Sequence, residues 1–226
     1  MGSTQPIRDQ KELEYFRDYY KNVKPSKRNY ALVVFGLNSA LRISDILNLR
    51  WRDVYDFRRD CFKDHVSVWE MKTNKKNTFA LNKHALEALA DFKATRKVKP
   101  ADFVFTKSTN LRSPICRQTA FRIIKRVGLA LHNETISCHS MRKTFGYYAW
   151  KNGAQPALLM DIYNHSSYQV TKRYLGIDQD EKDEIFYQMN LWKTLYLLAF
   201  QRKWKFFYKK LKKGVKYLRN NPIYKV

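Results

Sequence analysis

The segment His165-Ser166-Ser167-Tyr168-Gln169-Val170-Thr171-Lys172-Arg173-Tyr174 carries the most specific pattern in this sequence of 226 residues. A tyrosine follows a histidine by nine residues, and Gly176 stands just past the tyrosine. The surrounding sequence predicts two short helices, over residues 155–163 and 167–175. His165 would then lie between these helices, and Tyr174 near the end of the second.

Three segments upstream complete a set of residue types that no single folding requirement calls for. They are Ala40-Leu41-Arg42-Ile43-Ser44-Asp45-Ile46-Leu47, Met71-Lys72-Thr73 and His139-Ser140-Met141-Arg142-Lys143-Thr144-Phe145. Two arginines, two histidines and a lysine therefore precede the tyrosine, which is typical of a phosphate clamp with a nucleophile. The candidate catalytic residues are Arg42, Lys72, His139, Arg142, His165 and Tyr174.

Attack on a phosphodiester builds negative charge on the non-bridging oxygens, which fixed donors must stabilise. Arg42 and Arg142 suit this task, because a guanidinium delivers two hydrogen bonds to a phosphate and keeps its charge. His139, three residues before Arg142, would project from the same helix face. His165 can donate to the same oxygens or help to take the proton of the tyrosine. Tyrosine has a pKa near 10, so Tyr174 needs cationic neighbours that favour its phenolate.

Each of these residues also has a purely structural interpretation. Arg42 could be a salt-bridged helix residue, and Tyr174 could be a core aromatic, one of 15 tyrosines. A Lys-Thr turn is usually a solvated turn, and chance often produces the His-x-x-Arg pattern. The order of the candidate residues in the chain, the residues beside them and their expected positions on helices and turns nevertheless agree with one another. This agreement favours the functional interpretation of the whole set.

Composition indicates the kind of partner. The chain has 44 Lys and Arg against 20 Asp and Glu, a formal charge of +24. Such an excess predicts attraction to polyanions, with nucleic acid the commonest and an anionic membrane surface second. The three cysteines, Cys61, Cys116 and Cys138, show no CxxC pairing and predict free thiols in a reducing compartment. With no signal-peptide core and no apolar run of membrane-spanning length, we expect a cytoplasmic protein associated with DNA.

Hydrophobic periodicity predicts a mostly helical α+β fold. Helices are expected over residues 9–23, 27–39 and 45–49, the last capped by Ser44, and from Asn82 onward. Another would begin at Ser113-Pro114 and run to Leu131, and the next would extend from His139 to Asn152-Gly153.

Residues 54–81 show a different period. Val66, Val68 and Glu70 alternate with Ser67, Trp69 and Met71, and residues 78–81 are a second extended segment. Two or three short antiparallel strands therefore form a small sheet, with residues 73–77 as a turn.

Over residues 5–190, these motifs resemble the catalytic domain of tyrosine recombinases, the phage integrase family. The likeness is greatest to integrases of low-GC Gram-positive bacteria and their mobile elements. It implies that Tyr174 joins covalently to a 3′ phosphate and frees a 5′ hydroxyl, with no metal and no cofactor. Arg42 and Arg142 would clamp the phosphate, supported by His139 and His165, and Asp45 would support the first arginine. Lys72 would be the general acid, with Lys75 and Lys76 of the same turn left as alternatives.

The resemblance also implies partners and domain organisation. The expected partner is double-stranded DNA, on which the protein would self-associate as a tetramer, and no membrane partner is expected. Residues 1–190 would be the catalytic domain. Most family members carry an N-terminal helical domain that closes the DNA clamp, and we expect this sequence to begin at the catalytic domain, without that clamp.

Residues 191–226 contain eleven lysines and arginines and no acidic residue. We expect this basic aromatic tail to be helical to about residue 200 and to lie along nucleic acid beyond it. Docking on a neighbouring protomer, a membrane-surface helix and a weakly ordered appendage are the alternatives.

Three other functions compete with site-specific recombination. A type IB topoisomerase uses a similar clamp and tyrosine but works as a monomer. A non-catalytic DNA-binding protein derived from a recombinase would not need to keep Tyr174. A basic RNA-binding protein would explain the charge but not the candidate catalytic residues.

Overall fold

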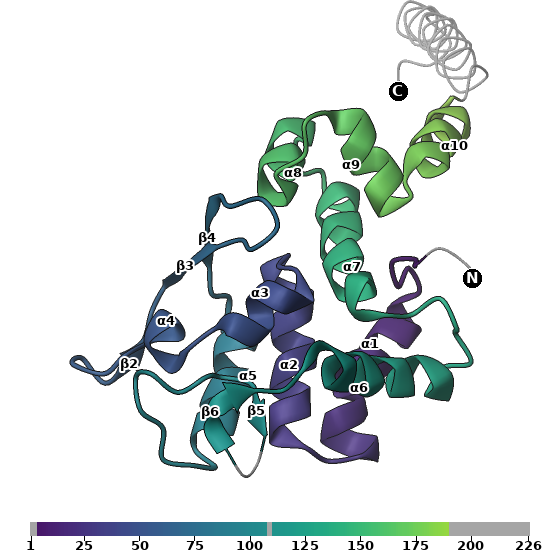
Figure 1. Cartoon of the computed structure of the whole chain (residues 1–226). Helices are drawn as coiled ribbons and strands as arrows, with labels where there is room; N and C mark the ends of the chain where they lie inside the picture. Colours follow the sequence, from purple (N-terminus) through teal and green to yellow (C-terminus); the bar gives the residue numbers. More distant parts are fainter. Residues whose placement is uncertain (1–3, 108–109, 190–226) are drawn as a thin grey trace, which may run out of the picture. The chain divides into compact units, whose positions relative to one another are not determined.

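The computed structural model describes residues 4–107 and 110–189, which divide into two units between Asp178 and Gln179. The first unit is mostly helical (Figure 1). Its helices are α1 (Gln10–Asp18), η1 (Tyr19–Val23), α2 (Lys27–Ser39), α3 (Ile43–Asn48), α4 (Trp51–Val54), α5 (Lys83–Lys93), α6 (Arg117–Ala130), α7 (Cys138–Lys151), α8 (Pro156–Tyr163) and α9 (Tyr168–Leu175). Helix α10 (Asp178–Gln188) begins at the unit boundary. The tail predicted from residue 191 lies outside the described residues.

The strands form small antiparallel pairs, and the alternation predicted those within residues 54–81 but not the pair between residues 106 and 114. They are β1 (Tyr55–Asp56) with β2 (Cys61–Phe62), β3 (His65–Trp69) with β4 (Lys76–Ala80), and β5 (Thr106–Lys107) with β6 (Asn110–Pro114). In the β3–β4 hairpin, Val66 pairs with Phe79 and Val68 with Asn77. The mostly helical α+β prediction is thus confirmed, with separate two-stranded sheets in place of a single one.

Local capping explains where most helices begin. The side chains of Ser26, Asn82 and Ser167 each accept a backbone N–H in the first turn of α2, α5 and α9. Gly176 ends α9 in a left-handed conformation with φ of 74°, which glycine adopts without a steric penalty. These caps set the length of the helix that carries Tyr174.

Two hydrophobic clusters position the site. The larger packs α1, α2, α5 and α6 around buried residues such as Phe16, Leu32 and Phe35. The smaller contains Ala40, Tyr163, Leu175 and Ile177, with Tyr174 packed against it. Arg142 of α7 and Tyr174 of α9 both contact the Tyr163 ring of this smaller cluster.

The N-terminal segment of the described chain is tied to α7 and to the end of α9. Lys143 Nζ donates to the Thr4 carbonyl at 2.7 Å, and the Ile7 N–H donates to Thr144 Oγ1 at 2.9 Å. Arg8 Nη2 donates to the carbonyl of Gly176 at 2.6 Å. Residues 4–8 thus join the helix of Arg142 to the cap that follows Tyr174.

Two predicted helix starts are wrong. Ser44 lies inside α3, whose N-cap is Arg42, because the backbone is extended at Arg42 and turns helical at Ile43. Ser113 and Pro114 belong to strand β6, and α6 begins later, after the N-cap residue Cys116. Antiparallel pairing of Pro114 with Thr106 prevails there over the tendency of proline to begin a helix.

Within residues 4–107 and 110–189, no helix is long and apolar enough to cross a membrane. Cys61, Cys116 and Cys138 are free thiols, as predicted.

Candidate active site

The two candidate arginines meet at a carboxylate. Arg42 Nη1 donates to Glu70 Oε2 at 2.6 Å, and Arg142 Nη1 lies 3.9 Å from Glu70 Oε1. The Glu70 side chain is fully buried, whereas that of Arg42 is 16% exposed. The N-cap residue of α3, a residue of α7 and the residue that follows β3 therefore form one charged cluster, with Arg42 at its solvent side.

Arg142 is held by groups on several sides. Its Nη1 donates to the carbonyl of Ala40, and its Nη2 donates to the carbonyl of Tyr163 at 3.3 Å. Gly146, one turn further along α7, leaves room for the Tyr163 hydroxyl, which a Cβ at this position would overlap. The orientation of the guanidinium is thus set before any substrate arrives.

Tyr174 packs against these residues from α9. Its ring centre lies 5.4 Å from that of Tyr163 and 5.3 Å from that of His165. The ammonium of Lys143 lies 5.1 Å from the centre of the same ring. Within residues 4–107 and 110–189, the Tyr174 hydroxyl is buried and has no hydrogen-bond partner. An oxygen without a partner, close to cationic groups, suits a nucleophile.

Burial raises the pKa of the Tyr174 phenol, whereas Arg142 and Arg42 act in the opposite direction. The neutral phenol is therefore the resting form at neutral pH. A proton acceptor and additional positive charge are needed when the phenol reacts.

His165, whose ring contacts that of Tyr174, is a candidate for that acceptor. Its Nδ1 lies 3.1 Å from Thr171 Oγ1, and the Thr171 hydroxyl donates to the carbonyl of Ser167 at 3.3 Å. The single proton of the Thr171 hydroxyl is donated to Ser167, so the hydroxyl oxygen accepts from Nδ1–H of His165. Nε2 of His165 therefore carries the free lone pair. Burial, with the charges of Arg142 and Arg42, lowers the pKa of His165, so that its neutral form is favoured.

His139 lies three residues before Arg142 on α7 and is more exposed than His165. Partial desolvation, with the charges of Arg142 and Lys143, lowers the pKa of His139.

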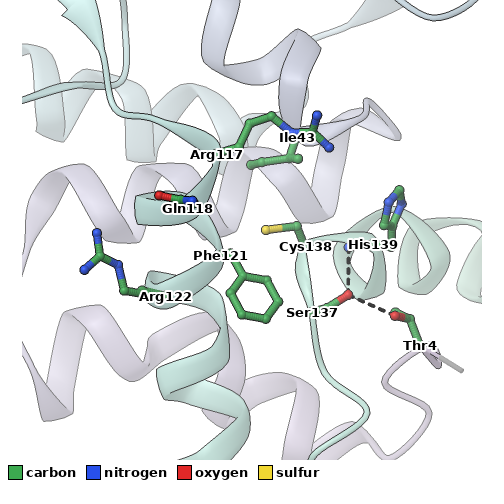
Figure 2. Close-up of a pocket in the computed structure, with 9 residues that line it drawn as sticks. All are labelled: Thr4, Ile43, Arg117, Gln118, Phe121, Arg122, Ser137, Cys138 and His139. Carbon is green, nitrogen blue, oxygen red and sulfur yellow. Dashed lines mark hydrogen bonds between the residues drawn. The ribbon is translucent and has the colours of Figure 1, made fainter. Parts of the chain in front are cut away.

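His139 borders an open pocket of about 880 Å³ between the starts of α6 and α7 (Figure 2). In Figure 2 the sulfur of Cys138 points toward Phe121 and other side chains of α6. The pocket is lined by Thr4, Ile43, Arg117, Gln118, Phe121, Arg122, Ser137, Cys138 and His139.

Lys72 lies in the exposed turn between β3 and β4, two residues after Glu70. Its ammonium makes no hydrogen bond or ion pair with the described part of the chain, and the structure does not bring it into contact with the other candidates. Asp45 anchors the same turn, since its Oδ1 accepts the N–H of Met71 at 3.0 Å. Burial raises the pKa of Asp45, and its Oδ2 has no partner in the described residues.

Two residues of the cluster were not predicted. Glu70 shares a strand face with Val66 and Val68, so the alternation already indicated that this acidic residue is buried. Tyr163 is fully buried beneath Arg142, and nothing in the sequence distinguishes it from other core tyrosines.

Among the described residues, no group of three or more His, Cys, Asp or Glu could hold a metal ion. What the site does contain is a pair of oriented guanidiniums, neutral histidines and a buried phenol. This set can bind a phosphate group beside an oxygen nucleophile.

Fold and site together define a helical protein in which cationic side chains surround a tyrosine. The chain belongs to the phage integrase family, whose model matches residues 8–181. It is 39% identical over 180 residues to a probable integrase/recombinase, YoeC, of Bacillus subtilis, covering 80% of this chain and 93% of that protein. It is 26% identical to a probable integrase/recombinase of Acholeplasma phage L2, covering 80% of this chain and 61% of the phage protein. The chain also spans 44% of tyrosine recombinase XerC of Caldanaerobacter subterraneus subsp. tengcongensis, at 26% identity over 70% of its own length.

Solved structures share the fold. The XerA recombinase superposes with a TM-score of 0.66 at 20% identity, covering 83% of this chain and 66% of XerA. The Tn1549 transposon integrase in complex with circular intermediate DNA superposes with a TM-score of 0.62 at 22% identity, covering 77% of this chain and 63% of the integrase.

Proposed function

We propose that this protein cleaves and rejoins double-stranded DNA through a 3′-phosphotyrosine intermediate at Tyr174, as a site-specific recombinase. The observation that carries the proposal is the cluster around Arg142. This guanidinium is joined through Glu70 to Arg42 and through the Tyr163 ring to Tyr174. Membership in the integrase family and the DNA complex of the Tn1549 integrase support the same conclusion.

In the proposed reaction, the Tyr174 oxygen attacks phosphorus and the bond from phosphorus to the 5′ oxygen breaks. Nε2 of His165 takes the phenol proton, and Lys72 protonates the leaving 5′ oxygen. Arg42 and Arg142 stabilise the negative charge on the non-bridging oxygens. Rejoining reverses these steps with the 5′ hydroxyl of another strand, and the phosphotyrosine conserves the energy of the broken bond.

No metal has a step in this mechanism, since the guanidiniums supply the positive charge at phosphorus. EDTA should therefore leave cleavage by the protein unchanged. Loss of activity in EDTA, restored by added Mg²⁺, would contradict this part of the proposal.

Trapping on a nicked suicide substrate tests the covalent step. Cleavage near the nick releases a short oligonucleotide, so rejoining fails and the protein stays attached to the DNA in a denaturing gel. The wild-type protein and Tyr168→Phe, a matched change on the same helix, should form this adduct, and Tyr174→Phe should not. DNA binding without any adduct by the wild-type protein would instead favour a non-catalytic DNA-binding protein.

Recombination also requires two DNA sites, for which we propose a tetramer assembled on DNA. Analytical ultracentrifugation of the protein with a two-site substrate should show four protomers. A single protomer on each DNA that still relaxes supercoils would favour a type IB topoisomerase.

A further inference from the structure

Glu70 contacts both arginines and also the turn that carries Lys72. Its Oε2 accepts from Arg42 Nη1 at 2.6 Å and from Thr73 Oγ1 at 2.8 Å. Its Oε1 accepts from Asn77 Nδ2 at 3.2 Å and lies 3.9 Å from Arg142 Nη1. Both oxygens of this fully buried carboxylate are thus used, each by one arginine and one residue of the β3–β4 hairpin.

This carboxylate is ionised in the folded protein. Burial alone would raise the pKa of Glu70, but the hydrogen bonds from Thr73, Arg42 and Asn77 outweigh it and lower the pKa below its ordinary value. A fixed negative charge therefore lies beside two guanidiniums. Such a charge restricts the planes of both forks without occupying all their donors, because each guanidinium has five N–H groups.

The backbone of Glu70 also closes the turn. Its N–H donates to the carbonyl of Lys75 at 2.9 Å, and its carbonyl accepts the N–H of Asn74 at 2.9 Å. Asn74 adopts a left-handed conformation with φ of 50°, which lets the turn return to β4. The conformation of residues 70–75, and with it the position of the Lys72 backbone, depends on the residue that orients the arginines.

We propose that Glu70 is a positioning residue with two separable functions in the strand-cleavage reaction. Through Arg42 and Arg142 it orients the phosphate clamp, and through Thr73 and Asn77 it fixes the turn that presents the general acid Lys72. This inference rests on the proposed function. It adds that a single buried carboxylate positions both the arginines that stabilise the charge at phosphorus and the turn whose lysine protonates the leaving oxygen.

Two substrates separate these functions. One nicked suicide substrate has the ordinary 5′ oxygen at the scissile position, and the other has a 5′-bridging sulfur, which leaves without protonation. Single-turnover rates of adduct formation are measured for the wild-type protein, Glu70→Gln, Thr73→Val and Asn77→Ala. Glu87→Gln is the matched control, because Glu87 is exposed on α5 and pairs only loosely with Lys83, at 3.9 Å.

Thr73→Val and Asn77→Ala loosen the turn and leave the bond between Glu70 and Arg42 in place. They should slow cleavage of the ordinary substrate by about tenfold, a part of the roughly 10²–10⁴ that a general acid contributes. Both should cleave the sulfur substrate within about threefold of the wild-type rate.

Glu70→Gln removes the charge between the arginines and should slow the ordinary substrate by at least about 10²-fold, the effect of losing a preorganised donor. The sulfur substrate should restore only part of that loss, because the clamp is still disordered. Glu87→Gln should match the wild-type protein on both substrates.

The outcomes distinguish the two proposals. If the wild-type protein forms no adduct on either substrate, the proposed function itself is wrong. If the wild-type protein is active and Glu70→Gln matches it on both substrates, Glu70 has no positioning role. Should Glu70→Gln fail to fold, judged by circular dichroism, the hairpin variants decide: equal slowing of Thr73→Val on both substrates would contradict the link to the general acid.

Discussion

The guanidinium of Arg142 lies 4.6 Å from the centre of the Tyr163 ring, and two hydrogen bonds join these residues. Arg142 Nη2 donates to the carbonyl of Tyr163 at 3.3 Å, and the Tyr163 hydroxyl donates to the carbonyl of Arg142 at 2.6 Å. Because Tyr163 also packs against His165 and Tyr174, it forms a common support for three of the candidate catalytic residues. Its hydroxyl and its ring can be tested separately.

Tyr163→Phe should lower the free energy of unfolding by about 1 kcal/mol, the usual net value of one buried hydrogen bond. The ring remains beneath Arg142, so adduct formation should fall by less than about tenfold. Tyr163→Leu also removes the ring and should reduce adduct formation much further. Urea unfolding and single-turnover cleavage measure the two effects, with Tyr15→Phe as a partly exposed control. Equal cleavage by the Phe and Leu variants would contradict the role of the ring.

Tyr174→Phe should abolish covalent attachment to DNA without lowering the stability of the fold, which is the reverse of the effect expected for Tyr163→Phe. The buried Tyr174 hydroxyl has no hydrogen-bond partner in the part of the chain that the structure describes, so removal of the oxygen leaves no other group there unsatisfied. The free energy of unfolding should stay the same or rise, by up to about 1 kcal/mol, because an unpaired buried hydroxyl is unfavourable. Covalent attachment should disappear while DNA affinity stays within about twofold. Urea unfolding, gel trapping and a binding titration test these points, and a clear loss of stability would show that the hydroxyl has a partner.

Arg42→Lys and Arg142→Lys should each slow adduct formation by at least about 10²-fold, since an ammonium cannot reproduce the planar fork. Arg142→Lys should also destabilise the fold more than Arg42→Lys. Arg142 is buried and donates to two carbonyls, whereas Arg42 is partly exposed. Rates and unfolding curves are compared with those of Arg58→Lys, a surface change on the β1–β2 connection. Full activity of either Lys variant would exclude a bidentate phosphate contact by that arginine.

Lys72 is the proposed general acid, and Lys75 and Lys76 are the alternatives; all three are exposed in or beside the β3–β4 turn. Each is changed to Ala and tested on the ordinary substrate and on the substrate with a 5′-bridging sulfur. We expect Lys72→Ala to be slow on the first and close to wild type on the second, because sulfur leaves without a proton. The other two variants should show no substrate-dependent rescue. If the sulfur substrate instead rescues Lys75→Ala or Lys76→Ala, the lysine that was replaced in that variant is the general acid.

The lowered pKa of His165 predicts a dependence of stability on pH. Its ordinary value is 6.5, and in the folded protein burial and the nearby arginines hold it lower. The unfolded state therefore binds protons more readily, so this contribution is complete above pH 6.5 and is lost as the pH falls through the folded-state value. Urea unfolding at pH 7.5 and pH 5.0 should show a larger loss for the wild-type protein than for His165→Gln. An equal loss in both proteins would mean that the pKa of His165 is not lowered on folding.

The sequence alone determined the helices of Arg142 and Tyr174, which are α7 and α9. Ser167 as N-cap and Gly176 as C-cap delimit α9, and both signals are local, since each satisfies or frees backbone groups within one turn. Periodicity likewise placed His139 and Arg142 on one face of α7, because residues three apart on a helix are neighbours. The order of the motifs was also sufficient to indicate the integrase family, which the comparisons confirm.

Only the tertiary structure decided how these residues are held. The alternation from Val66 to Glu70 indicates a buried carboxylate, but its partners Arg42 and Arg142 come from distant parts of the sequence, before α3 and within α7. Pro114 shows the same limit, because pairing with Thr106 across a hairpin outweighs its local preference for a helix start. Capping and periodicity depend on neighbours within a few residues, whereas burial of a charge is tolerable only where folding brings an opposite charge to it. The support of Arg142 by Tyr163 and its link through Glu70 to Arg42 therefore emerge only when the chain is folded.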